Sequence, residues 1–141
     1  MSELVKQRVL ILCTGNSCRS QMAEGWINHL YGEHIEAFSA GHIPAGAVHP
    51  MTIQVMREVG VDLSGARPKH MNEFLDQPFD TVITVCDPAK QVCPVFPGKM
   101  QRIHRTFDDP VDARGSDEER LAEFRRVRDE IREWVGELFV E

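Results

Sequence analysis

One run of residues near the N-terminus could bind an oxyanion and attack it. It reads Cys13-Thr14-Gly15-Asn16-Ser17-Cys18-Arg19-Ser20 and has the pattern C-x5-R-S. A tetrahedral oxyanion needs convergent N–H donors and a planar cation, which the amides of a loop before a helix and the guanidinium of Arg19 can supply. Cys13 shares this positive field, which favours its thiolate, and Ser20 can donate a hydrogen bond to the sulfur. We predict Cys13 as the nucleophile, and as substrate-binding residues Thr14, Gly15, Asn16, Ser17, Cys18 and Arg19.

The same pattern also fits a purely structural role without chemistry, in which Cys13 is buried at the end of a strand and Arg19 lies on the surface of a helix. The sequence around the pattern favours the oxyanion loop. An apolar run precedes it, glycine and serine lie within it, and a helical pattern follows it. This order is typical of a loop that leads from a strand into the N-terminus of a helix.

A second pair of cysteines, Cys86 and Cys93, follows another apolar run with C-x6-C spacing. The alternative of a zinc site is disfavoured, because this spacing is too long for the usual zinc knuckle and thiolate ligation would consume the nucleophile. The six histidines are scattered, and no two of them have H-x3-H spacing. The segment between the two cysteines is polar and proline-flanked, which is typical of an exposed loop. We predict a redox role for both cysteines and no bound metal.

A third candidate is Asp109 in the run Phe107-Asp108-Asp109-Pro110. Expelling hydroxide from a tetrahedral oxyanion is difficult without a proton, and a carboxyl group near other anions can supply one. Asp109 is therefore the candidate general acid. Asp-Asp-Pro is also ordinary turn chemistry, so both interpretations stay open at this point.

Alternating strands and helices must position these residues. We expect strands at 8–13, 35–40, 81–86 and 101–107, and helices from Ser20 to about Gly32, from Pro50 to about Gly60, and from Ser116 to the C-terminus. Ser116 and Glu119 form a capping box for the last helix. Strands interleaved with helices predict an α/β fold, a single domain over residues 1–141 with an open parallel four-stranded sheet and helices on both faces. Cys13 and Cys86 both end strands, so they could meet at the edge where such sheets bind ligands.

Composition narrows the class of protein further. The chain has 141 residues, 42% of them hydrophobic and 27% charged, which is ordinary for one globular domain. A net charge of −6 with dispersed basic residues argues against nucleic-acid binding. The longest apolar run, Val9–Cys13, is too short for a signal or a membrane span. We expect a cytoplasmic monomer with reduced cysteines and no membrane contact.

Four segments together resemble the thioredoxin-coupled arsenate reductases, a family built on the low-molecular-weight tyrosine phosphatase fold. They are Leu12–Gly25, Ser39–Gly41, Cys86–Cys93 and Phe107–Pro110. The resemblance runs over nearly the whole chain. It implies arsenate as the substrate, with phosphate or sulfate as competing oxyanions, and no bound cofactor.

The resemblance also implies roles for the candidate residues. Cys13 attacks arsenate, Arg19 and the loop amides bind it, and Asp109 protonates the departing hydroxide. Cys86 then attacks Cys13 and releases arsenite, and Cys93 attacks Cys86. The remaining disulfide would be reduced by thioredoxin, although glutaredoxin or a low-molecular-weight thiol acts by the same chemistry.

Two other functions use part of the same pattern. A low-molecular-weight tyrosine phosphatase hydrolysing phosphate monoesters would share the nucleophile, the arginine and the acid, but has no need for Cys86 and Cys93. Such phosphatases resemble one another in having aromatic residues after the Asp-Pro pair, where this chain has Val111 and Asp112. A noncatalytic metalloid sensor would use the cysteines as ligands and would bind arsenite without turnover.

The chain departs from the family at a cation site. The resemblance implies a potassium site beside the loop, as in many members. Its ligands would be residues that match Asn16, Glu24 and Ser39, together with a threonine and an aspartate. Arg67 and Lys69 stand where that threonine and aspartate would be. Either a lysine ammonium replaces the ion, or Lys69 is a solvated surface residue.

Overall fold

The computed structural model describes residues 6–85 and 100–139, so Cys86 and Cys93 lie outside the described residues. The elements in chain order are β1 (Gln7–Cys13), α1 (Arg19–Tyr31), β2 (Ile35–Gly41), α2 (Pro50–Glu58), the 3-10 helix η1 (Met71–Phe74), β3 (Thr81–Thr84), β4 (Gln101–His104), the 3-10 helix η3 (Pro110–Asp112) and α3 (Asp117–Leu138).

The strands form one parallel sheet in the order β2-β1-β3-β4. At its carboxyl edge Cys13 pairs with Gly41, and Leu12 pairs with Thr84. The predicted α/β class and four-stranded parallel sheet are therefore confirmed. Because β1 is a central strand, Cys13 lies in the middle of the edge where parallel sheets bind ligands.

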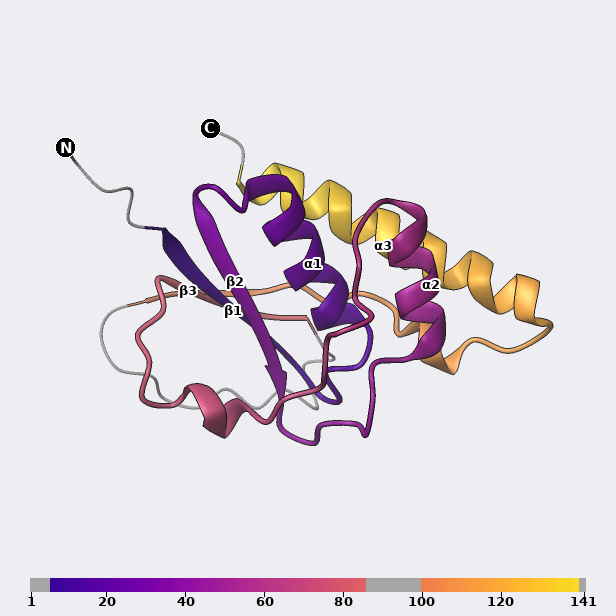
Figure 1. The fold of residues 1–141 in the computed structure, drawn as a ribbon, viewed down its shortest axis with the longest axis horizontal. Helices are drawn as coiled ribbons and strands as arrows, with labels where there is room; N and C mark the ends of the chain where they lie inside the picture. The colour runs from indigo at the N-terminus through magenta and orange to yellow at the C-terminus, as the bar shows by residue number, and fades with distance from the viewer. Residues whose placement is uncertain (1–5, 86–99, 140–141) are drawn as a thin grey trace.

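The two faces of the sheet are covered unequally. Val9 and Ile11 of β1 face a core that contains the inward side chains of α1, α2 and α3. Leu10 and Leu12 face a smaller core formed with Phe74 of η1 and its neighbours. Figure 1 shows the three α-helices on one side of the strands and η1 on the other. Within the described ranges, the second covering is thus a 3-10 helix and its flanking segments.

Local signals explain where the helices begin and end. Ser116 Oγ accepts a hydrogen bond from the Glu119 N–H, and the Glu119 carboxylate accepts one from the Ser116 N–H. The predicted capping box therefore starts α3. Pro50 occupies the first turn of α2, and Gly60 takes a φ of 86° just after it. That φ lies in the left-handed region, where glycine has no steric penalty.

The last strand is shorter than predicted. It ends at His104, whereas the sequence suggested Phe107. The chain turns inward after Arg105, whose N–H donates to Thr84 O over 2.9 Å. Phe107 is then buried with its ring centroid 5.7 Å from that of Trp134 on α3. This turn brings the segment with Asp109 to the carboxyl edge of the sheet.

Candidate active site

The oxyanion loop joins the end of β1 at Cys13 to the start of α1 at Arg19. Its carbonyls are occupied by backbone donors from residues 43–49. The bonds are Ile43 N to Thr14 O at 3.0 Å, Ala45 N to Gly15 O at 2.8 Å, and His49 N to Ser17 O at 3.0 Å. Since these carbonyls are satisfied by backbone donors from outside the loop, the loop is held in place without any bound anion.

Two backbone features permit this arrangement. A Cβ added to Gly41 would lie 2.4 Å from Thr14 O, so only glycine fits where β2 passes the loop. Asn16 has a φ of 53°, the left-handed conformation that asparagine tolerates better than most residues. Sequence reasoning did not identify residues 43–49 or the role of Gly41, because backbone contacts between distant segments leave no local signal.

The Cys13 sulfur has two neighbours that could stabilise a thiolate. Asn16 N donates to Sγ over 3.2 Å, and Ser20 Oγ lies 3.0 Å from it. Asn16 Nδ2 donates to Ser20 Oγ over 2.8 Å. Because Ser20 accepts that bond, its own hydrogen is free to point at the sulfur. The structure thus brings Cys13 and Ser20 together in the geometry that the sequence suggested.

The guanidinium of Arg19 is fixed by partners from two other segments. Nη1 donates to Phe107 O over 3.0 Å and lies 3.5 Å from Val85 O, while Nη2 pairs with Asp109 Oδ2 at 3.3 Å. Arg19 is 8% exposed. It is therefore not a surface arginine, and the structural alternative for the C-x5-R pattern is wrong in its placement of Arg19, although Cys13 is indeed buried at the end of a strand.

Asp109 serves both as a turn residue and as a wall of the pocket. Its Oδ1 accepts the Val111 N–H over 3.1 Å and so caps η3. A cavity of about 250 Å³ is lined by Cys13, Thr14, Gly15, Asn16, Ser17, Cys18, Arg19, Asp109, Val111 and Asp112. The predicted binding residues and the candidate acid therefore border one cavity, although 90 residues separate Arg19 from Asp109.

Cys18 lines the same pocket but has a different character from Cys13. Burial raises the pKa of the Cys18 thiol to about 12, and contacts with Thr52 and Arg19 offset this only in part. Cys18 therefore remains a thiol near neutral pH. Its side chain is packed in the main core, which agrees with the resemblance, since that scheme implies no redox role for Cys18.

Gln21 is a site residue that sequence reasoning missed. It is fully buried, and its Nε2 lies 3.1 Å from each of Asn16 O, Asn16 Oδ1 and Arg67 O. Gln21 thereby links the oxyanion loop to the segment that follows α2. The sequence shows only a polar residue beside the apolar stripe of α1, and a surface position would have fitted equally well.

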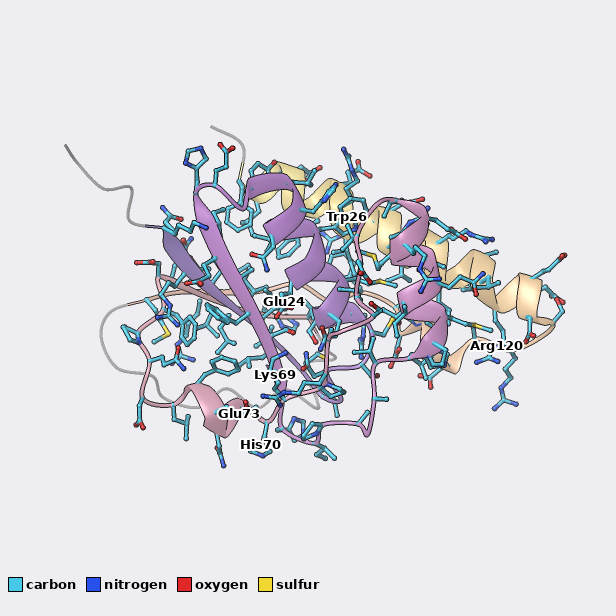
Figure 2. All side chains as sticks on the ribbon, viewed as in Figure 1. Glu24, Trp26, Lys69, His70, Glu73 and Arg120 are labelled. Atoms are coloured by element: carbon cyan, nitrogen blue, oxygen red, sulfur yellow. The ribbon has the colours of Figure 1, made fainter. Side chains whose placement is uncertain are left out.

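The structure decides between the two interpretations of Lys69. Its side chain is 15% exposed, so the surface interpretation is wrong. Lys69 Nζ donates to Arg67 O over 3.1 Å and lies 4.0 Å from Glu24 Oε1. The Arg67 side chain instead pairs with Glu73 and is 66% exposed. In Figure 2, Lys69 lies between α1, which carries Glu24, and η1, which carries Glu73.

These contacts do not fit a bound potassium ion. The Lys69 ammonium already approaches the Glu24 carboxylate that would serve as a ligand, and a second cation there would be repelled. No cluster of three or more His, Cys, Asp or Glu side chains within residues 6–85 and 100–139 could hold a metal ion. Among the helices of the same ranges, none is long and apolar enough to cross a membrane.

The profile of the low molecular weight phosphotyrosine protein phosphatase family matches residues 8–141. The chain belongs to this family. A relative from Halalkalibacterium halodurans named arsenate reductase is 48% identical over 126 residues, which cover 89% of this chain and 90% of the relative.

Solved structures of family members agree with this placement. An arsenate reductase in the phosphate binding state superposes with a TM-score of 0.80 at 33% identity, over 94% of this chain and 95% of that one. A thioredoxin-dependent arsenate reductase from Corynebacterium glutamicum gives a TM-score of 0.72 at 29% identity, over 95% of this chain and 60% of that one. The family predicted from the sequence, arsenate reductases on the low molecular weight phosphatase fold, is confirmed.

Proposed function

We propose that this chain reduces arsenate to arsenite in the pocket of the oxyanion loop and is reset by thioredoxin or a similar thiol reductant. The observation that carries the proposal is the environment of Cys13. Its sulfur receives the Asn16 N–H and faces the Ser20 hydroxyl in a pocket that also holds Arg19 and Asp109. The arsenate reductases among the relatives and solved structures support the choice of oxyanion.

The first step joins sulfur to arsenic. The Cys13 thiolate attacks arsenate held by the loop amides and Arg19, an As–S bond forms, and one oxygen leaves as water. Asp109 supplies the proton for that oxygen, because its carboxyl group lines the pocket beside Arg19.

The second step transfers two electrons to arsenic. The Cys86 thiolate attacks the Cys13 sulfur, the As–S bond breaks with its electron pair on arsenic, and arsenite leaves. Cys93 then attacks Cys86, which frees the Cys13 thiolate and leaves a disulfide between Cys86 and Cys93. Both cysteines lie outside the described residues, but Val85 directly precedes Cys86 and its carbonyl lies 3.5 Å from Arg19 Nη1.

The relay needs cysteines that are kept reduced. For this reason we place the protein in the cytoplasm, where thioredoxin maintains free thiols, and propose that it acts there as a monomer on a free oxyanion. The pocket carries its own nucleophile, cation and acid, so the chemistry requires no bound cofactor.

The proposal is tested by arsenate-dependent NADPH oxidation with thioredoxin and thioredoxin reductase, run beside hydrolysis of an aryl phosphate. Fast hydrolysis without arsenate reduction would identify a phosphatase instead. Cys86→Ala is expected to lose arsenate reduction while keeping whatever hydrolysis the wild type shows.

Cys93→Ala tests the end of the relay. It should release about one arsenite per enzyme and then stall as a Cys13–Cys86 disulfide, because the electrons cannot reach the reductant. Mass spectrometry of the stalled enzyme after proteolysis locates the disulfide. Sustained turnover of Cys93→Ala with thioredoxin would contradict the relay.

A further inference from the structure

A largely buried ion pair lies beside the oxyanion loop and takes no part in the mechanism above. Glu24 of α1 is 18% exposed and Lys69 is 15% exposed, with Nζ 4.0 Å from Oε1. Burial raises the pKa of Glu24, and the charge of Lys69 lowers it and offsets the shift in part. Two charges held mostly away from water are costly unless other groups compensate them, so their surroundings need an explanation.

Lys69 contacts the oxyanion loop and the segment after α2 through two different nitrogens. Its backbone N–H donates to Asn16 Oδ1 over 2.9 Å, and its ammonium donates to Arg67 O over 3.1 Å. Both acceptors also face Gln21 Nε2 at 3.1 Å. Lys69 and Gln21 together supply nitrogen donors to a group of oxygens between α1 and the segment after α2.

The same group of oxygens is linked to the nucleophile through Asn16. Its side-chain nitrogen donates to Ser20 Oγ over 2.8 Å, its backbone N–H donates to Cys13 Sγ over 3.2 Å, and its φ is 53°. A left-handed asparagine persists only where its surroundings hold it. The Lys69 N–H and Gln21 hold the Asn16 side-chain oxygen, which directs the opposite end of that amide at Ser20.

We propose that Lys69 is a positioning residue of the oxyanion loop, whose ammonium is a built-in cation that neutralises Glu24 and keeps Asn16, Ser20 and Cys13 in their reactive arrangement. The protein thus carries its own cation where the family resemblance implied potassium. The proposal rests on the proposed function in one respect, that the loop held in this way is the one that binds arsenate. Without the ammonium, the negative charge of the Glu24 carboxylate would repel the thiolate and the bound oxyanion.

The first test replaces the ammonium and leaves the backbone contact. In Lys69→Met the backbone N–H to Asn16 remains, so the variant removes only the ammonium, with its charge and its bond to Arg67 O. We expect the arsenate KM to rise about tenfold while kcat changes less than about threefold, because the loop binds the anion less well. Alkylation of Cys13 by iodoacetamide at pH 7, followed by peptide mapping, should slow severalfold. The matched control is Arg67→Met, which removes an exposed cation from the same segment and should leave both measurements unchanged.

A second variant separates charge from packing. Combining Glu24→Gln with Lys69→Met removes both charges, and it should recover most of the arsenate affinity and of the Cys13 reactivity. In Lys69→Ala, potassium or ammonium should lower the arsenate KM toward the wild-type value. The wild type should respond equally to potassium and sodium at constant ionic strength.

Three results would overturn the proposal. They are Lys69→Met behaving like Arg67→Met in both measurements, the double variant being as impaired as Lys69→Met, and potassium activating the wild type severalfold. The alkylation measurement does not involve arsenate. A wild type that fails to reduce arsenate would therefore refute the proposed function, while the response of Cys13 to Lys69→Met would still decide the role of the lysine.

Discussion

The two walls of the pocket are built in different ways. The loop wall, residues 13–20, is held by backbone bonds from residues 43–49 and by buried side chains, and its Asn16 and Ser20 are fully buried. The acid wall, residues 107–112, is anchored by the buried Phe107, but the side chains of Asp108 and Asp109 are more exposed than the buried side chains of the loop wall. The side chain of Asp109 is 33% exposed, and the neighbouring Asp108 is 76% exposed and pairs with Arg126 over 3.0 Å.

This difference indicates a division of labour. Groups that bind the oxyanion must be in place before it arrives, because donors that need no rearrangement stabilise charge best. The proton donor needs access to solvent to regain its proton after each turnover. We therefore expect changes in the loop wall to affect binding and the nucleophile together, and changes in the acid wall to affect mainly the rate of the first chemical step.

The largest effect should come from Cys13→Ser. Without the thiolate no As–S bond forms, so arsenate reduction should fall below about one-thousandth of the wild-type rate. The coupled NADPH assay measures this loss. Phosphate binding and the melting temperature serve as controls, because the loop amides and Arg19 remain. Activity above one-tenth of wild type would move the nucleophile to another residue.

The two cysteines of the loop wall should differ sharply in reactivity. With a pKa of about 12, Cys18 holds only about one part in ten thousand of thiolate at pH 8, so iodoacetamide should modify Cys13 and leave Cys18 untouched. Peptide mapping after a short reaction with the reduced protein tests this. Unfolding in guanidinium should make both react alike. Equal labelling in the native state would show that the loop wall is more open than its burial indicates.

Asp109→Asn probes the acid wall. Loss of the proton donor should slow the first step about 100-fold, the scale of a single general acid, and the arsenate KM should stay constant or fall because a negative charge is removed. Single-turnover arsenite release follows the first and second steps together, so a first step slowed to this extent appears as slower release. A matching loss in Asp112→Asn, which changes another pocket carboxylate, would show that the effect is one of general charge and not of proton donation.

Arg126→Met should give the smallest effect. Arg126 pairs with Asp108, Glu123 and Glu130, and its side chain is 39% exposed. Exposed ion pairs contribute about 0 to 1 kcal/mol, so we expect a small loss in the free energy of unfolding and less than a twofold change in kcat. Urea denaturation and steady-state assays measure both. A tenfold loss of kcat would mean that this surface network orients Asp109, and the acid wall would then be as rigid as the loop wall.

Much of this architecture is set by local properties of the sequence. The apolar run before Cys13, the capping box at Ser116 and the glycines after α1 and α2 fix where strands and helices begin and end. The C-x5-R-S run then places a nucleophile at the end of a strand and an arginine at the start of a helix. The spacing of hydrophobic residues, the helix caps and the residue types of the loop each depend on a few neighbouring residues. These features could therefore be predicted from the sequence alone.

The partners of those residues were decided only by the tertiary structure. Arg19 meets Asp109 and Phe107, Gln21 meets Arg67, and Lys69 is drawn beside Glu24 because sheet register and helix packing bring distant segments together. No pattern in the sequence distinguishes a partly buried lysine from a solvated one at position 69. Likewise, the α-helices of the described residues lie on one face of the sheet, because the choice of face depends on how each connection crosses the sheet and not on the helix itself.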